Sequence, residues 1–425
     1  MKPSRRLALS VHRISINMKR YRFYIAFFFV ALAVHFVLPL NWSDDAVFYE
    51  KAASTTLDDF LLTSARPLTD AATWAFAKVN LAWRIANPLV LTVLLAVVEE
   101  ILPIRKSRLT RLVSCFAVFP SIVLVDAGFI ATTVNYLWPI TFGLLCLFPI
   151  RNKLLKEKTP LWFKIALVPL LAYACNMQQM CAVLLGVLLC TNVYLWAVRK
   201  EFDLYVSLQT VAVGAMAVYS YSLNVFSDNS RMLRETARYF PDFGKLNILE
   251  KAELGFSSTF YCMTMELRLA FVGFVIFALF LAVCGIRMNK KPAFKAASVF
   301  PLVFSLGFGA LSLVKPEWIK AVCGGMVNGG VSKANYVFSP VSDLLFLLVL
   351  LCVVVSVVSL LKTKTSRIIS AFILAAGFGS RILMGFSPTV WASGYRTFAI
   401  LFVAFILIAL LILNENSGLS KDNPE

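Results

Sequence analysis

The sequence predicts an all-α protein whose helices cross a membrane about twelve times. Three observations lead to this fold class. Hydrophobic residues make up 59% of the 425 positions and charged residues only 15%, whereas soluble domains carry about 25% charged residues. Phenylalanine accounts for 36 residues, a content that fits a surface facing lipid. The hydrophobic residues also gather in blocks: Leu344–Leu361 is an uncharged run of eighteen residues, long enough to cross most of a bilayer core of about 30 Å.

The first apolar block, 23–40, follows a basic segment, residues 1–22. No small-residue cleavage site comes after the block, so we expect an uncleaved first helix rather than a signal peptide. Later blocks predict further helices, for a total between ten and thirteen. The pair 161–175 and 178–198 is short enough to be partly re-entrant. The predicted helices are 23–40, 85–102, 112–131, 134–150, 161–175, 178–198, 204–226, 265–286, 296–314, 338–361, 368–386 and 396–413.

Lysine and arginine gather in alternate connections between these helices. With the N-terminus in the cytoplasm, 26 of the 41 basic residues fall in inner segments. This asymmetry is the positive-inside pattern, and it predicts cytoplasmic N- and C-termini in a cell inner membrane. Topology and anionic inner-leaflet lipid explain the net charge of +18, which excludes a nucleic-acid partner. We expect one multi-pass domain over 23–413, with cytoplasmic segments at 1–22 and 414–425 and outer segments at about 41–84, 227–266 and 315–336.

A pair of carboxylates, Asp44 and Asp45, comes directly after the first predicted helix, on the outer side. Two adjacent carboxylates cannot both be ionised cheaply in a cleft of low dielectric, so one of them could act as a base. An ordinary solvated start of a loop explains the same residues. The spacing alone leaves both interpretations open.

Polar residues also interrupt the apolar blocks at two places. Asn135, Tyr136 and Trp138 open the fourth predicted helix and are candidates for substrate binding. A structural role is the alternative, because aromatic residues are typical of the membrane interface. Asn176, Gln178 and Gln179 lie between two short apolar runs. Buried amides need hydrogen-bonding partners, which a sugar hydroxyl or a neighbouring helix could supply.

Two arginines, Arg381 and Arg396, flank a short outer loop between the last two predicted helices. Arginine binds phosphate through paired N–H groups, and this depth is that of a lipid phosphate. Snorkelling of the side chains to the interface is the alternative. A zinc site is not expected, because the two histidines and nine cysteines include no CxxC pair. The carboxylates leave a divalent metal undecided.

Several short motifs follow one another over residues 40–400. They are Asp44-Asp45, then Arg66-Pro67, then Asn-Tyr-Leu-Trp-Pro at 135–139, then the amide segment at 176–179, then Ser-Pro at 387–388 with Ser-Gly-Tyr-Arg at 393–396. This order resembles a family of bacterial polytopic membrane proteins related to the GT-C glycosyltransferases.

The resemblance implies a GT-C-like fold, a sugar donor carried on polyprenyl phosphate and an outer glycan acceptor, with membrane lipid around the chain and no cofactor. It implies that Asp44 or Asp45 is the general base and that Arg381 and Arg396 hold the donor phosphate. Arg66 and Asn135 would line the cleft, and a flippase and a cytoplasmic donor-synthesising enzyme would be companions. The segment 176–179 departs from the pattern, since a glutamate is expected there, and this puts the activity of this copy in doubt.

Two other classes of protein fit some of these features. A flippase or transporter of lipid-linked saccharide predicts internal repeats and charges near the midplane, and the sequence shows no repeat. A surface-polysaccharide polymerase would use a large arginine-bearing outer segment, of which 227–266 is a modest version. An acyltransferase would need a buried histidine, for which His35 is the candidate. A purely structural membrane protein is the remaining interpretation.

Overall fold

The computed structural model describes residues 21–41, 43–62, 64–105, 107–118, 128–225, 231–288, 291–315, 317–318, 336 and 338–416. These residues form helices and no strand. Nine of the described helical stretches are long and apolar enough to cross a membrane, and the helices Tyr21–Val37 and Leu161–Cys175 are shorter apolar ones. The prediction of a multi-pass helical membrane protein is therefore confirmed. The nine stretches are Asn80–Glu100, Phe129–Leu154, Gln178–Arg199, Leu204–Leu223, Leu269–Met288, Pro292–Val314, Pro340–Leu360, Lys364–Phe386 and Tyr395–Asn416.

The helix α21 (Ala399–Asn416) forms the centre of the bundle. In the membrane-spanning stretch that contains α21, 89% of an 18-residue apolar segment is buried inside the protein. The corresponding value is 22% in the stretch that lies within α13 (Leu204–Val225). It packs on α20 (Lys364–Ile382) and on α16 (Leu269–Met288). The outer helices instead direct large apolar side chains away from the protein, as expected where lipid covers the surface.

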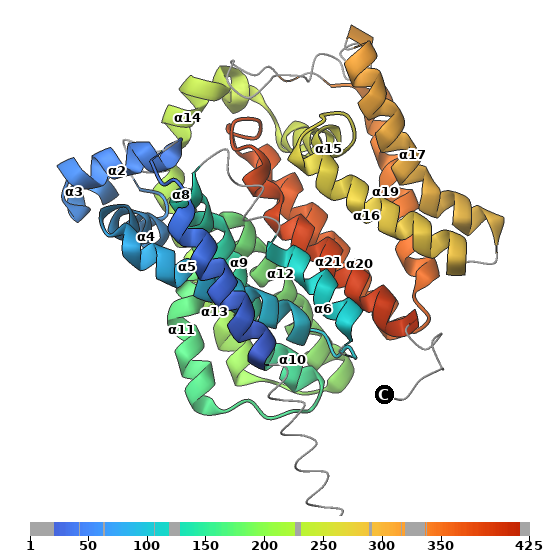
Figure 1. Ribbon diagram of the computed structural model, residues 1–425, viewed down its shortest axis with the longest axis horizontal. Coiled ribbons are helices and arrows are strands. Elements are labelled where there is room, and N and C mark those ends of the chain that lie inside the picture. The colour runs from blue at the N-terminus through green and yellow to red at the C-terminus, as the bar shows by residue number, and fades with distance from the viewer. Residues whose placement is uncertain are drawn as a thin grey trace, which may run out of the picture.

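A cluster of short helices separates the helix Tyr21–Val37 from α5 (Asn80–Glu100). Its members are α2 (Asp44–Ser54), α3 (Leu57–Leu61) and α4 (Pro67–Lys78). Figure 1 shows them at the same end of the bundle as α14 (Arg231–Tyr239) and α15 (Ile248–Thr264), whereas α10 (Phe148–Leu154) lies toward the opposite end. Local sequence explains the starts: Thr56 caps α3, Pro67 occupies the first turn of α4, and Asn247 caps α15 in a capping box with Glu250.

The helix boundaries that follow α6 (Arg108–Cys115) and η1 (Phe116–Val118) differ from the predicted ones. The sequence predicts one helix ending at 131 and another over 134–150. In the structure, a new span begins at Phe129 and continues to Leu154. It consists of α8 (Phe129–Thr132), the π-helical turn η3 (Thr133–Leu137), α9 (Trp138–Cys146) and α10. Gly128 precedes this span with a φ of 88°, and such a conformation ends any continuous helix at that residue.

The remaining described helices complete the bundle. The predicted helix 178–198 corresponds to α12 (Gln178–Tyr194) together with η4 (Leu195–Arg199), and this stretch of 22 residues is long enough to cross a membrane. The preceding α11 (Leu161–Cys175) has 15 residues. The other elements are η5 (Pro241–Lys245), α17 (Pro292–Val314), α19 (Pro340–Leu360), η6 (Leu383–Phe386) and η7 (Tyr395–Phe398).

Candidate functional site

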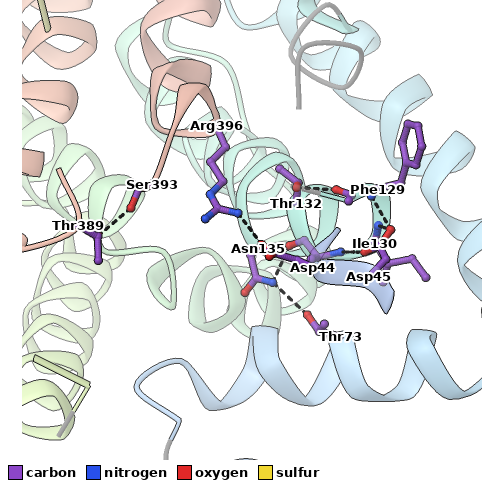
Figure 2. Close-up of polar contacts among 12 residues, drawn as sticks. Asp44, Asp45, Thr73, Phe129, Ile130, Thr132, Asn135, Thr389, Ser393 and Arg396 are labelled. Carbon is purple, nitrogen blue, oxygen red and sulfur yellow. Dashed lines mark hydrogen bonds and ion pairs between the residues drawn. The ribbon is translucent and has the colours of Figure 1, made fainter. Parts of the chain in front are cut away.

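The first residue of α2 and a residue of η7 meet at the end of the bundle that carries α2 and α4. Arg396 donates a hydrogen bond from Nη1 to Oδ2 of Asp44 at 2.9 Å, which also makes an ion pair (Figure 2). The two side chains remain accessible, at 47% exposure for Asp44 and 23% for Arg396. A carboxylate and a guanidinium, which are 352 residues apart in the sequence, thus form one site.

The neighbouring carboxylate, Asp45, faces the opposite way and is 2% exposed. It accepts hydrogen bonds from the backbone N–H groups of Phe129, Ile130 and Ala131 at 2.5, 3.0 and 2.9 Å (Figure 2). These are the donors that the first turn of a helix leaves without an intrahelical partner. Burial raises the pKa of the Asp45 carboxyl, and the three N–H bonds oppose that rise. Asp45 is therefore a cap for α8, and Asp44 is the member of the pair that faces an accessible site.

The backbone conformations at Ser43 and Gly128 help to place the two aspartates in different environments. Ser43, just before Asp44, has a φ of 55° and a ψ of −138°, a backbone conformation that residues other than glycine rarely adopt. At Gly128 a Cβ atom would lie 2.7 Å from Cγ of Asp45 and 2.8 Å from its backbone nitrogen. Only glycine lets α8 approach Asp45 closely enough for three hydrogen bonds.

The π-helical turn η3 brings Asn135 and Tyr136 to the same site. Asn135 is 4% exposed and donates from Nδ2 to Oγ1 of Thr73 at 3.0 Å and to the carbonyl of Ala131 at 2.7 Å (Figure 2). Its Oδ1 is buried without a hydrogen-bond donor among the residues that the structure describes. The ring of Tyr136 lies 5.8 Å from the guanidinium carbon of Arg396. π-Helical turns of this kind are frequent at functional sites.

The amides at 176–179 connect helices. Asn176 accepts a hydrogen bond from the backbone N–H of Leu68 at 2.9 Å, at the start of α4. Gln179 donates to the carbonyls of Ser380 and Thr397 at 2.7 and 3.1 Å. Gln178 is exposed. Of the two partners that the sequence left open for these amides, neighbouring helices supply the contacts of Asn176 and Gln179.

Arg66 begins α4 and is half-buried. Its Nε is buried and has no hydrogen-bond partner among the described part of the chain. The position of α4 therefore brings an additional guanidinium to the end of the bundle that carries Asp44, although no direct contact joins Arg66 to the Asp44–Arg396 pair in the described residues.

Two other residues selected from the sequence make no direct contact with the accessible pair among the described residues. Trp138 donates from Nε1 to Oδ1 of Asn87 at 2.8 Å, and Nδ2 of Asn87 lies 2.8 Å from Nε2 of His35. This buried chain of contacts joins the helix Tyr21–Val37 to α5 and α9. Arg381 is 1% exposed, and its guanidinium carbon lies 4.6 Å from the centre of the Phe398 ring. Its Nε and Nη1 have no hydrogen-bond partner among the described residues.

Sequence reasoning missed Thr73 and Gly128. A threonine in an amphipathic helix carries no signal for a partner 62 residues away. Gly128 lay inside the predicted helix 112–131, and the only signal for a break there was an isolated glycine in an apolar block. No family model, curated protein or solved structure gives a significant match to this chain.

Proposed function

We propose that the chain is an inverting glycosyltransferase that moves a sugar from a polyprenyl-phosphate donor to a glycan acceptor at the outer face of the cell inner membrane. The observation that carries the proposal is the accessible Asp44–Arg396 pair. It combines a carboxylate, which can take a proton, with a guanidinium, which can bind and stabilise phosphate. Both are side chains that the reaction requires within one site.

The chemistry needs no redox step. The Asp44 carboxylate takes the proton of an acceptor hydroxyl, and the resulting oxygen attacks the anomeric carbon of the donor sugar. The bond from that carbon to the phosphate oxygen breaks on the opposite face, and its electron pair leaves with the polyprenyl phosphate. Arg396 stabilises the charge that develops on this phosphate. Attack opposite the leaving group inverts the anomeric configuration.

The other polar groups of the site receive supporting roles in the proposal. Asn135, with its unpartnered Oδ1, would accept a hydrogen bond from a substrate hydroxyl, and Arg66 would line the same cleft. The guanidinium of Arg381 packs over the ring of Phe398, and its positive charge would add to the electrostatic attraction for the donor phosphate. A flippase and a cytoplasmic enzyme that makes the donor would be companions.

The proposed topology is GT-C-like, with twelve crossings and cytoplasmic termini. The nine long apolar stretches supply nine crossings. The helix Tyr21–Val37, α11 and the predicted helix that includes the end of α6 would supply the remaining three. In this topology the site faces outward, because the basic residues concentrate in the segments at the opposite end.

The test is deletion of the gene in its native host, followed by mass spectrometry of the surface glycans. We expect the loss of one sugar mass, restored by the wild-type gene and by Asp58→Asn, which changes an exposed carboxylate in the same outer segment. Asp44→Asn and Arg396→Gln should not restore it, although immunoblots show normal protein levels. An unchanged glycan would contradict the proposal. Loss of whole chains, with complementation by Asp44→Asn, would instead indicate transport or polymerisation.

A further inference from the structure

The Asp44–Arg396 ion pair has the features of a contact that a ligand can replace. Both side chains are accessible to solvent, and the guanidinium donates to the carboxylate from one nitrogen, Nη1. The pair is only partly buried, and ion pairs that water reaches are weak, because water screens the charges and both side chains lose freedom. Little therefore holds Asp44 on Arg396 against a stronger anion.

Arg396 also has donor capacity that Asp44 does not use. Its Nε is buried and has no hydrogen-bond partner among the described residues. A guanidinium offers five N–H donors in a planar fork and binds phosphate through pairs of them. A phosphate ester pairs two free oxygens with two of these N–H groups, whether it is the diester of a sugar donor or a monoester, which adds a third oxygen and more charge. It should therefore bind Arg396 in preference to Asp44.

From this geometry we propose that Asp44 is a resident anion that occupies the phosphate site of Arg396 and leaves when a phosphate ester binds. The inference rests on the proposed function and extends it to the order of events. In the ligand-free protein the carboxylate is held on Arg396. When phosphate takes the guanidinium, the carboxylate is released and can accept a proton from an acceptor. The base thus becomes available only after the donor has bound.

The phosphate that binds Arg396 has two candidate sources: a lipid-linked phosphate or free phosphate in solution. The test therefore measures the Kd of the full chain in lipid nanodiscs for farnesyl phosphate, farnesol and inorganic phosphate, by microscale thermophoresis. The variants are Asp44→Asn, Arg396→Gln and Arg396→Lys, with Asp58→Asn as the matched control. Size-exclusion profiles and thermal unfolding show whether each variant is folded.

We expect wild type to bind farnesyl phosphate but not farnesol. Asp44→Asn removes the competing anion and should tighten binding about two- to fivefold, the range that a weak ion pair within reach of water allows. Arg396→Gln should weaken it at least about tenfold, Arg396→Lys should weaken it less, and Asp58→Asn should match wild type. Equal affinity for inorganic phosphate, with the same response to Asp44→Asn, would support the exchange and identify free phosphate as the ligand.

Two results would overturn the inference. One is unchanged or weaker binding by folded Asp44→Asn, because a competing anion must raise affinity when it is removed. The other is binding by folded Arg396→Gln that equals wild type. This experiment is independent of sugar transfer. Tighter binding by Asp44→Asn together with an unchanged glycan after gene deletion would leave the anion exchange in place and reject the glycosyltransferase.

Discussion

Gln179 donates a hydrogen bond to the backbone carbonyl of Thr397, the residue that follows Arg396. The same amide nitrogen bonds the carbonyl of Ser380, so one side chain from α12 contacts both the last turn of α20 and η7. Gln179 is 5% exposed. The position of Arg396 opposite Asp44 therefore depends on a helix that contributes no side chain to the ion pair.

Replacing Gln179 with alanine leaves these two carbonyls without their donor. We expect a loss of about 1–3 kcal/mol in unfolding free energy, together with weaker binding of farnesyl phosphate because η7 loses its support. Thermal unfolding in detergent and the nanodisc binding assay measure the two effects. Gln178→Ala, one residue earlier and exposed, should stay within about 0.5 kcal/mol of wild type. Equal effects of the two substitutions would contradict the role of Gln179.

Asp45→Ala removes the acceptor for three backbone N–H groups of α8. We expect a loss of at least about 3 kcal/mol, because each buried donor left without a partner costs about 1–3 kcal/mol. Asp45→Asn keeps an acceptor oxygen and should lose less. Denaturant-induced unfolding in detergent measures the difference, with Asp58→Ala as the control. A variant Asp45→Ala as stable as the control would show that Asp45 is not a cap.

Gly128→Ala places a Cβ atom 2.7 Å from Cγ of Asp45 in a backbone conformation with positive φ. The clash and the strain should together cost more than about 2 kcal/mol. Gly186→Ala is the matched control, because a Cβ there meets nothing within 4 Å and alanine favours a helix over glycine. We expect a lower melting temperature for Gly128→Ala and an unchanged or higher one for Gly186→Ala. The reverse order would contradict the packing of α8 on Asp45.

Trp138→Phe keeps an aromatic ring but removes the donor to Asn87. We expect a loss of about 1–3 kcal/mol, because the buried Asn87 carbonyl oxygen is left without its indole partner. Binding of farnesyl phosphate should not change, since Trp138 makes no direct contact with the Asp44–Arg396 pair in the described part of the chain. Trp162→Phe, on an indole that is 70% exposed, gives the control for stability. A variant Trp138→Phe that binds more weakly but unfolds normally would assign Trp138 to the binding site instead.

The sequence was sufficient to predict a helical membrane protein, because apolar block length and charge asymmetry follow directly from the thickness and chemistry of a bilayer. It was also sufficient to select Asp44 and Arg396 as candidates. It could not predict that they meet, since that contact depends on how η7 and α2 pack at one end of the bundle. The different environments of Asp44 and Asp45 were also hidden, because they depend on the close approach of α8 at Gly128.

The burial of α21 at the centre of the bundle affects how the protein folds during its synthesis. A ribosome synthesises this segment after every other described helix, yet it fills the centre of the bundle. Until it inserts, the earlier helices surround a space with no side chains to occupy it, and their inner faces must meet lipid or one another. A chain that stops before Tyr395 would lack both this central helix and Arg396. Insertion of this helix therefore completes both the described bundle and the proposed site.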